Sequence, residues 1–307
     1  MSIAFLFPGQ GSQYPGMLHS LPAHPVVHST IKEASDILEK DVLTLDSEFT
    51  QNAELAVQLC LFIASVAVAN ALQQEGVTPD MVAGLSVGAF AAAVVCNSLN
   101  FADGLTVVTK RAQLMQHKFP SGYGMSAIEG LTEQRVAELV ARIHTESNPV
   151  YLSNINAPLQ IVVSGCNAGL DLLEKAALQS GARKVKRLPV TVPSHCALFR
   201  SEADILQQEM QKFNMAPPSV KYVGNVKARA LRTAEAIAED LATNVAHGVR
   251  WYDSVSVLVE LGADLFIEMN PGSVLTRLGG DLFPEQRFIA AEESSIGYLS
   301  KLAASRK

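Results

Sequence analysis

The segment Gly84–Gly88, with the sequence Gly-Leu-Ser-Val-Gly, constrains the fold of this chain more than any other. The apolar residues Met81–Ala83 before it predict a buried strand, and the apolar run Ala89–Val95 after it predicts a helix packed against a sheet. A serine between two glycines at such a turn is typical of a nucleophile elbow. The turn would expose the hydroxyl of Ser86 and aim the backbone N–H of Val87 at the same space, as half of an oxyanion hole.

Short apolar runs alternate with longer helical stretches over most of the chain. The expected strands are Ile3–Phe7, Met81–Gly84, Lys221–Val223 and Leu265–Glu268. The expected helices, besides the one after the elbow, are Gln58–Gln74, Phe101–Lys118, Ser201–Phe213, Ala234–Ala242 and Tyr252–Leu261. This alternation favours an α/β fold with a mostly parallel sheet covered on both faces.

Residues 122–190 have a different pattern. The segments there alternate as strand, helix, strand, strand, helix and strand, which is the order of a ferredoxin-like unit. We therefore expect a small domain at 122–190, inserted into a large catalytic domain formed by residues 1–121 and 191–307.

Composition excludes several classes of protein. The net charge is −6, from 24 Lys and Arg against 30 Asp and Glu, which argues against a nucleic-acid-binding domain. The apolar run Leu59–Leu72 is shorter than the ~20 residues of a membrane span. His24 and His28 are four residues apart but lack a third metal ligand. We expect a cytoplasmic protein that binds no metal and acts on neither a membrane nor a nucleic acid.

Three further residues are candidates for a site around the serine. His195, in the loop Thr191–Ala197, is a candidate base, although a structural loop histidine explains this position about as well. Gln10, in the glycine-rich segment Phe7–Gln13, has an amide that can donate to an oxyanion; no complete phosphate-binding motif is present there. Arg111 either faces solvent on its helix or pairs with a substrate carboxylate.

Taken together, these pieces resemble the malonyl-CoA:acyl-carrier-protein transacylase family over nearly the whole chain. The segments that carry the resemblance are Phe7–Gln13, Gly84–Gly88, Lys110-Arg111, Ile155–Gln160, Val192–Ala197 and Glu268–Gly272. The resemblance implies an α/β-hydrolase-like large domain with a ferredoxin-like insertion.

The resemblance also implies roles for the site residues. Ser86 is the expected nucleophile and His195 the general base, which we expect to titrate near neutral pH. The side chain of Gln10 and the N–H of Val87 are the expected oxyanion hole. Arg111 is expected to bind the free carboxylate of the malonyl group.

Other expectations concern the substrate and its partners. The backbone carbonyl of Asn244 is expected to orient the base, and Asn244, Met125 and Asn156 are expected to lie at the substrate. Malonyl-CoA would donate the acyl group, and the thiol of a phosphopantetheine-type arm on an acyl-carrier protein would accept it. No cofactor is expected to stay bound to the enzyme itself.

Two departures from the family pattern bear on the pathway. The family elbow is Gly-His-Ser-Leu-Gly-Glu, whereas Leu85 and Ala89 stand here in place of the histidine and the acid. Together with Ser121–Met125, Leu85 makes the chain resemble most the transacylase (epsilon) subunit of malonate decarboxylase. The alternatives are a malonyl transacylase of fatty-acid or polyketide synthesis, a serine thioesterase or hydrolase, and a non-catalytic subunit that docks a carrier.

A basic cluster marks the end of the small domain. It consists of Arg183, Lys184, Lys186 and Arg187 in a chain that is acidic overall. The cluster is either a docking surface for an acidic carrier or a solvated strand face.

Overall fold

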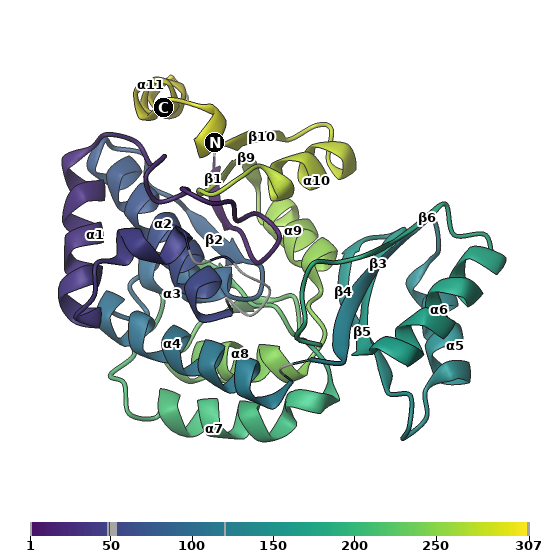
Figure 1. Ribbon diagram of the computed structural model, residues 1–307. Helices are drawn as coiled ribbons and strands as arrows, with labels where there is room; N and C mark the ends of the chain where they lie inside the picture. Colours follow the sequence, from purple (N-terminus) through teal and green to yellow (C-terminus); the bar gives the residue numbers. More distant parts are fainter. Residues whose placement is uncertain (1, 48, 50–53, 120, 306–307) are drawn as a thin grey trace.

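The structure is a computed structural model that describes residues 2–47, 49, 54–119 and 121–305 (Figure 1). Two sheets organise it. A six-stranded sheet lies at the centre of a large helical body, and a four-stranded sheet with two helices lies beside it. The α/β fold expected from the sequence is confirmed.

The large sheet has the strand order β10-β9-β1-β2-β7-β8. Its strands are β1 (Ser2–Phe7), β2 (Met81–Gly84), β7 (Lys221–Val223), β8 (Ala230–Leu231), β9 (Ala263–Glu268) and β10 (Arg287–Ala290). All neighbours are parallel except the pair β7 and β8. Phe7 pairs with Gly84, so the loops that follow β1 and β2 leave the sheet side by side.

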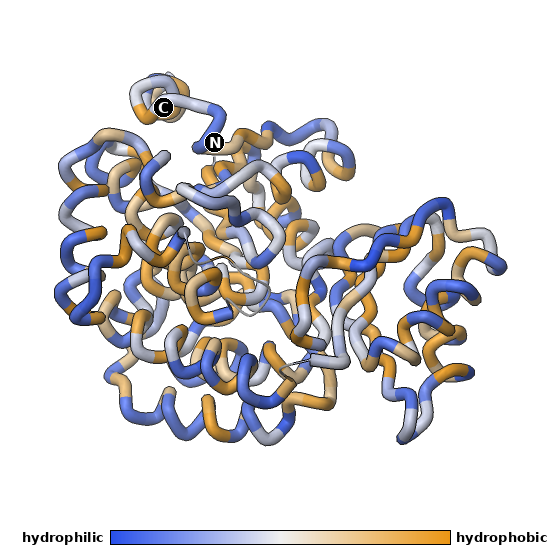
Figure 2. The backbone as a smooth tube through the Cα atoms, in the orientation of Figure 1, coloured by the Kyte–Doolittle hydropathy of each residue, from blue (hydrophilic) through white to orange (hydrophobic). Residues whose placement is uncertain are grey.

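Helices cover both faces of this sheet. They are α1 (Pro25–Leu38), α2 (Glu54–Gln74), α3 (Gly88–Val95), α4 (Phe101–Lys118), α7 (Arg200–Met210), α8 (Ala234–Thr243), α9 (Trp251–Glu260), α10 (Val274–Leu282) and α11 (Ile296–Ala304). Short 3-10 helices span Val42–Ser47, Ala197–Phe199, Asn244–Ala246 and Ala291–Glu293. Side chains of β1 alternate between two cores: Phe5 packs with α2 and α3, and Leu6 packs with α9 and α10. Outer helices such as α1 and α7 alternate between polar and apolar positions (Figure 2), as amphipathic helices do.

Helix α2 is apolar on nearly all sides. The helix has 21 residues, more than the sequence predicted, and it is long and apolar enough to cross a membrane. Yet 89% of its most apolar window is buried inside the protein. A helix that is hydrophobic all round is buried, here among α1, α3 and α4.

The small sheet is fully antiparallel, with the order β4-β5-β3-β6. Its elements are β3 (Tyr123–Glu129), α5 (Glu133–Ile143), β4 (Val150–Ala157), β5 (Gln160–Cys166), α6 (Asn167–Gln179) and β6 (Lys184–Arg187). This order and connectivity are those of the ferredoxin-like unit expected from the sequence. Residues 121 and 190, at the predicted domain boundaries, lie in the connections before β3 and after β6; the boundaries themselves stay a prediction.

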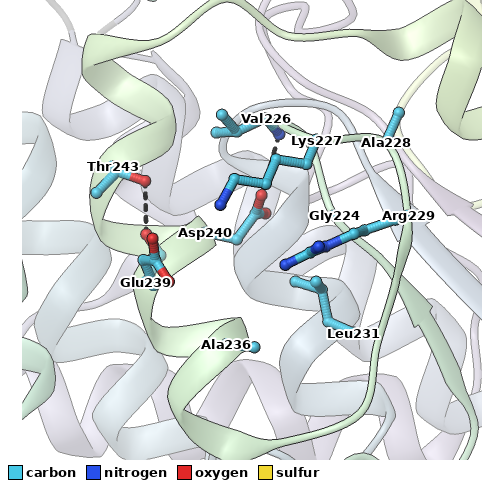
Figure 3. A pocket seen from close by; sticks show the side chains of 10 residues that line it. All are labelled: Gly224, Val226, Lys227, Ala228, Arg229, Leu231, Ala236, Glu239, Asp240 and Thr243. Atoms are coloured by element: carbon cyan, nitrogen blue, oxygen red, sulfur yellow. Dashed lines mark hydrogen bonds between the residues drawn. The ribbon is translucent and has the colours of Figure 1, made fainter.

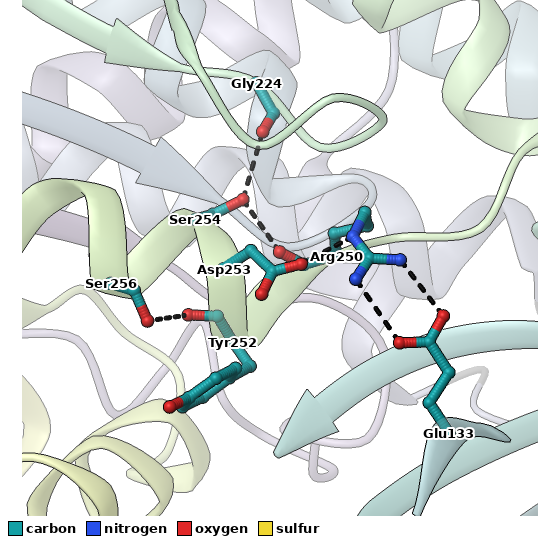
Figure 4. A network of polar contacts seen from close by, with 7 residues as sticks. All are labelled: Glu133, Gly224, Arg250, Tyr252, Asp253, Ser254 and Ser256. Atoms are coloured by element: carbon teal, nitrogen blue, oxygen red, sulfur yellow. Dashed lines mark hydrogen bonds and ion pairs between the residues drawn. The ribbon is translucent and has the colours of Figure 1, made fainter. Parts of the chain in front are cut away.

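Two contacts join the sheets next to α9. The backbone of Val249 pairs with β4, through hydrogen bonds of 2.8 Å that link its carbonyl to the N–H of Ile155 and its N–H to the carbonyl of Ser153. Arg250 forms a bidentate ion pair with Glu133 at the start of α5, with Nη1 3.1 Å from Oε1 and Nη2 3.3 Å from Oε2 (Figure 4). Arg250 and Glu133 are both 40% exposed, so their pair adds little stability compared with the backbone bonds.

Besides the short 3-10 helices, three α-helices and two strands were not expected from the sequence, namely α1, α10, α11, β8 and β10. Strand β8 has only two residues, which is too short to show a period. Helix α10 contains the adjacent glycines Gly279 and Gly280, which disfavour a helix. Gly279 is nevertheless needed there, because a Cβ at this position would lie 2.1 Å from the ring of Phe288.

Candidate active site

The segment between β2 and α3 forms a sharp elbow at Ser86. Ser86 has a φ of 56°, a left-handed conformation that costs a non-glycine residue of order 1–3 kcal/mol. A Cβ at Gly84 would lie 2.1 Å from the backbone of Gly88, and one at Gly88 would lie 2.2 Å from the carbonyl oxygen of Phe7. Both positions therefore require glycine, and the elbow packs directly against the end of β1.

His195 contacts the serine. Its Nε2 lies 2.8 Å from Ser86 Oγ, and its Nδ1 lies 2.6 Å from the backbone oxygen of Asn244. A carbonyl oxygen only accepts hydrogen bonds, so Nδ1 carries the proton and Nε2 is the acceptor for the serine hydroxyl. The imidazole is thus in the tautomer that a general base needs.

Burial keeps this imidazole neutral. His195 is 3% exposed, and burial followed by the nearby positive charge of Arg111 lowers its pKa to about 4. The expectation that the base titrates near neutral pH is therefore wrong, because the sequence does not show that the imidazole is buried beside a guanidinium.

Arg111 reaches the serine from α4. Its guanidinium is fully buried; Nη2 donates to Ser86 Oγ at 3.0 Å, and Nη1 donates to Gln58 Oε1 at 2.6 Å. Burial lowers the pKa of Arg111 to about 10, against the opposing effect of the Glu54 carboxylate, so the group stays charged at neutral pH. Its Nε has no hydrogen-bond partner among the described residues. The Nε and Nη2 edge therefore offers two donors beside the nucleophile.

The side chain of Gln10 has a different partner from the one expected. Its Nε2 donates to Glu54 Oε2 at 3.0 Å, and Glu54 also accepts from Gln58 Nε2. A buried carboxylate needs donors, and Gln10 supplies one of its two amide N–H groups. The role of this amide at an oxyanion stays a prediction, carried by its second N–H. The loop is still at the elbow, since a Cβ on Gly9 would lie 2.7 Å from the carbonyl oxygen of Leu85.

The two N–H groups at the elbow differ. That of Ser86 donates to Asn225 Oδ1 at 2.9 Å. That of Val87, which precedes the first turn of α3, donates to no described residue. Val87 therefore carries the donor that remains for a ligand, at the positive end of a helix.

The structure adds Gln58, Glu54 and Asn225 to the residues around the serine. A glutamine at the start of an otherwise apolar helix was a usable signal for Gln58, because such a polar group needs a partner. No pattern in the sequence singled out Asn225, which lies 139 residues from Ser86.

The remaining candidates lie at different places. Met125 is near the base, since its Sδ accepts from the hydroxyl of Ser194 at 3.3 Å. The side-chain amide of Asn244 is buried, and neither of its polar atoms has a described partner. Asn156 lines a cavity of about 610 Å³ between the β4–β5 hairpin and α10, together with Arg183 and Arg277.

The basic cluster at β6 is partly neutralised. Arg183 and Lys184 pair with Glu129, and Arg187 pairs with Asp171 and Glu174 of α6. Arg187 lies opposite Ser126 and Lys186 opposite Ala127, so the two side chains point to opposite faces of the small sheet. Within residues 2–305 as described, no group of three or more His, Cys, Asp or Glu side chains is placed to hold a metal ion.

Comparison with known proteins places this chain in a family. Residues 4–301 match the acyl transferase domain model. The chain belongs to the acyl transferase family. It is 37% identical over 277 residues to a protein of Salmonella typhimurium named malonyl CoA-acyl carrier protein transacylase, covering 88% of this chain and 89% of the relative. It is 34% identical over 281 residues to the Bacillus subtilis protein of the same name, covering 89% and 87%.

Solved structures of acyl transferases have the same fold as this chain. The malonyl CoA-acyl carrier protein transacylase of Coxiella burnetii has a TM-score of 0.93 and 32% identity, covering 100% of this chain and 98% of the other. A malonyl-transacylase in complex with its type II PKS acyl-carrier protein has a TM-score of 0.92 and 31% identity, with full coverage of both. The resemblance to the malonyl-CoA:acyl-carrier-protein transacylase family is confirmed; the closeness to the malonate decarboxylase subunit stays a prediction.

Proposed function

We propose that this acyl transferase moves a malonyl group from malonyl-CoA to the thiol of an acyl-carrier protein, through an ester on Ser86. The observation that carries the proposal is the fully buried guanidinium of Arg111, 3.0 Å from Ser86 Oγ. A buried cation needs an anionic partner, and the carboxylate of a malonyl group supplies one at the nucleophile. Its two oxygens match the Nε and Nη2 edge of the guanidinium.

In the first half-reaction, Ser86 Oγ attacks the thioester carbonyl while its proton passes to His195 Nε2. The negative charge on the carbonyl oxygen is stabilised by the N–H of Val87 and, we infer, by a donor of Gln10, either its backbone N–H or the second N–H of its side-chain amide, since Glu54 accepts only the first. The C–S bond then breaks, and the CoA sulfur takes the proton from His195. The products are malonyl-Ser86 and free CoA.

In the second half-reaction, the carrier thiol replaces CoA. Its proton passes to His195 Nε2, and its sulfur forms a bond to the ester carbonyl. When the C–O bond breaks, Ser86 Oγ takes the proton back. The imidazole is neutral between the two half-reactions, which a pKa of about 4 ensures at neutral pH.

Intact-mass measurement after mixing the enzyme with malonyl-CoA tests this function. We expect one malonyl adduct on Ser86, which disappears when a carrier with a free thiol is added. Adduct loss at an equal rate without a carrier, with free malonate released, would instead identify a hydrolase. No adduct under either condition would favour a subunit that docks a carrier without catalysis.

Arg111 is expected to select the acyl group. Arg111→Ala should lower kcat/KM for malonyl-CoA by about 100-fold, since breaking a buried charge pair costs roughly 3 kcal/mol or more. The ratio of acetyl to malonyl transfer should rise, because acetyl has no carboxylate. Rates with both CoA esters measure this, with the exposed Arg135→Ala as the matched control. An unchanged ratio would contradict the assignment.

The pathway is a finer proposal that rests on the resemblance at Leu85, Ala89 and Ser121–Met125. We propose that the enzyme is cytoplasmic and serves malonate decarboxylation. Ala89 is fully buried in α3 and Leu85 is half-buried against the core, so these changes make the surroundings of the elbow more apolar, while Ser86 Oγ contacts His195 and Arg111.

Transfer to two carriers tests the pathway. With both at equal concentration, we expect malonyl transfer to a malonate decarboxylase carrier subunit to be at least about tenfold faster than to a fatty-acid carrier, a difference of ~1.4 kcal/mol. Faster transfer to the fatty-acid carrier would assign the enzyme to the alternative pathway and leave the site assignments unchanged.

A further inference from the structure

A buried side chain, that of Asn225, forms hydrogen bonds with the backbone of the elbow. Asn225 follows β7 and is 2% exposed. Its Oδ1 accepts from the N–H of Ser86 at 2.9 Å, and its Nδ2 donates to the carbonyl oxygen of Gly84 at 2.8 Å. One amide thus spans the two backbone groups on either side of the turn. Because an N–H only donates and a carbonyl only accepts, the amide has a single orientation that satisfies both.

Asn225 is itself fixed by a buried carboxylate. The N–H groups of Asn225 and Val226 donate to the two oxygens of Asp240 on α8, both at 3.0 Å. Figure 3 shows Asp240 beneath this loop, with its carboxylate directed at the N–H of Val226. A small pocket beside Asp240 is lined by this loop and by α8.

We propose that Asn225 is a positioning residue for the nucleophile, which holds Ser86 in its left-handed conformation so that Oγ meets His195 Nε2 and the N–H of Val87 stays free for the oxyanion. The inference rests on the proposed role of Ser86. The left-handed turn is unfavourable for serine, so the backbone needs an external constraint. The amide supplies it without touching the acyl group, the base or Arg111. Asn225 therefore affects the acylation rate and not substrate binding.

The variant Asn225→Asp distinguishes positioning from mere structural support. A protonated carboxyl has the same shape as the amide and keeps both bonds, with one oxygen accepting from Ser86 and the O–H donating to Gly84. The ionised form has no donor and places negative charge against the carbonyl oxygen of Gly84. Burial and the adjacent Asp240 both raise the pKa of such a carboxyl. The other charged groups nearby are Arg111 and the titratable His195, beyond Ser86, and Lys227, Arg229 and Glu239, which line the pocket with Asp240. All of them are unchanged between variants.

The experiment follows single-turnover formation of the malonyl adduct between pH 5.5 and 8. For Asn225→Asp, divided by the wild-type rate at each pH, we expect near-normal acylation at the acidic end and at least a tenfold loss at the alkaline end. Asn225→Ala should be slow by tenfold or more at every pH, with a profile parallel to the wild type. The malonyl-CoA concentration for half-maximal rate should stay within twofold in both variants.

The outcomes separate the two proposals. The exposed Asn97→Asp adds a carboxyl elsewhere and should follow the wild type at every pH. If wild-type enzyme forms an adduct and Asn225→Asp shows no additional pH dependence, the positioning role is wrong. If wild-type enzyme forms no adduct on Ser86, the proposed function itself fails. If Asn225→Ala does not fold, the pH series of Asn225→Asp still tests the positioning role, because it compares the relative rate of one folded variant at different pH values.

Discussion

Ser86→Ala should abolish the malonyl adduct and lower transfer to the carrier by at least about 10³-fold. Oγ is the one atom that both His195 Nε2 and Arg111 Nη2 contact, at 2.8 and 3.0 Å. Removing it takes away the atom that is proposed to carry the acyl group, whereas the other side chains of the site stay. Binding of malonyl-CoA should therefore persist while chemistry stops.

Intact mass and steady-state transfer measure this effect together. Ser147→Ala, at an exposed turn of the small sheet region, is the matched control and should retain the adduct. A malonyl adduct that survives in Ser86→Ala would place the nucleophile elsewhere. Unchanged transfer without any adduct would replace the two-step route with direct transfer between the two thiols.

The sequence predicted those parts of the site that are encoded locally. Gly84 and Gly88 are required by close backbone contacts, and a strand and a helix flank them, so the elbow is visible within the continuous segment Met81–Val95. The ferredoxin-like order was visible for the same reason, because each of its elements has its own period. His195 was a candidate from its loop, but its role depended on the family resemblance.

The parts that were missed depend on tertiary contacts. The contact between the Gln10 amide and Glu54 was not visible in the sequence, because the two residues lie 44 positions apart. Asn225 follows the short strand β7, and it reaches the elbow because β7 lies next to β2. The pKa of His195 depends on burial and on Arg111, neither of which follows from residue type.

His195→Ala should lower acylation by about 10²–10⁴-fold, since an unassisted serine hydroxyl is a poor nucleophile near neutral pH. The pH dependence of the wild-type rate of adduct formation gives a second, more specific test of His195. Burial and Arg111 lower the pKa of the imidazole to about 4, so its accepting form dominates above that pH and is lost as the pH falls through it. The rate of adduct formation should therefore be nearly constant from about pH 6 to 8 and fall only near pH 4.

Single-turnover labelling across this pH range measures the profile, and His117→Ala, which alters an exposed imidazole on α4, is the matched control. A midpoint near 6.5 would mean that the base is solvated and unaffected by Arg111 before it reacts, which contradicts the buried arrangement. In Arg111→Ala, loss of the neighbouring positive charge should move the low-pH midpoint upward, because less then opposes protonation of the imidazole. Such a shift would show that the charge of Arg111 acts on His195, as expected for two groups that contact Ser86 in one site.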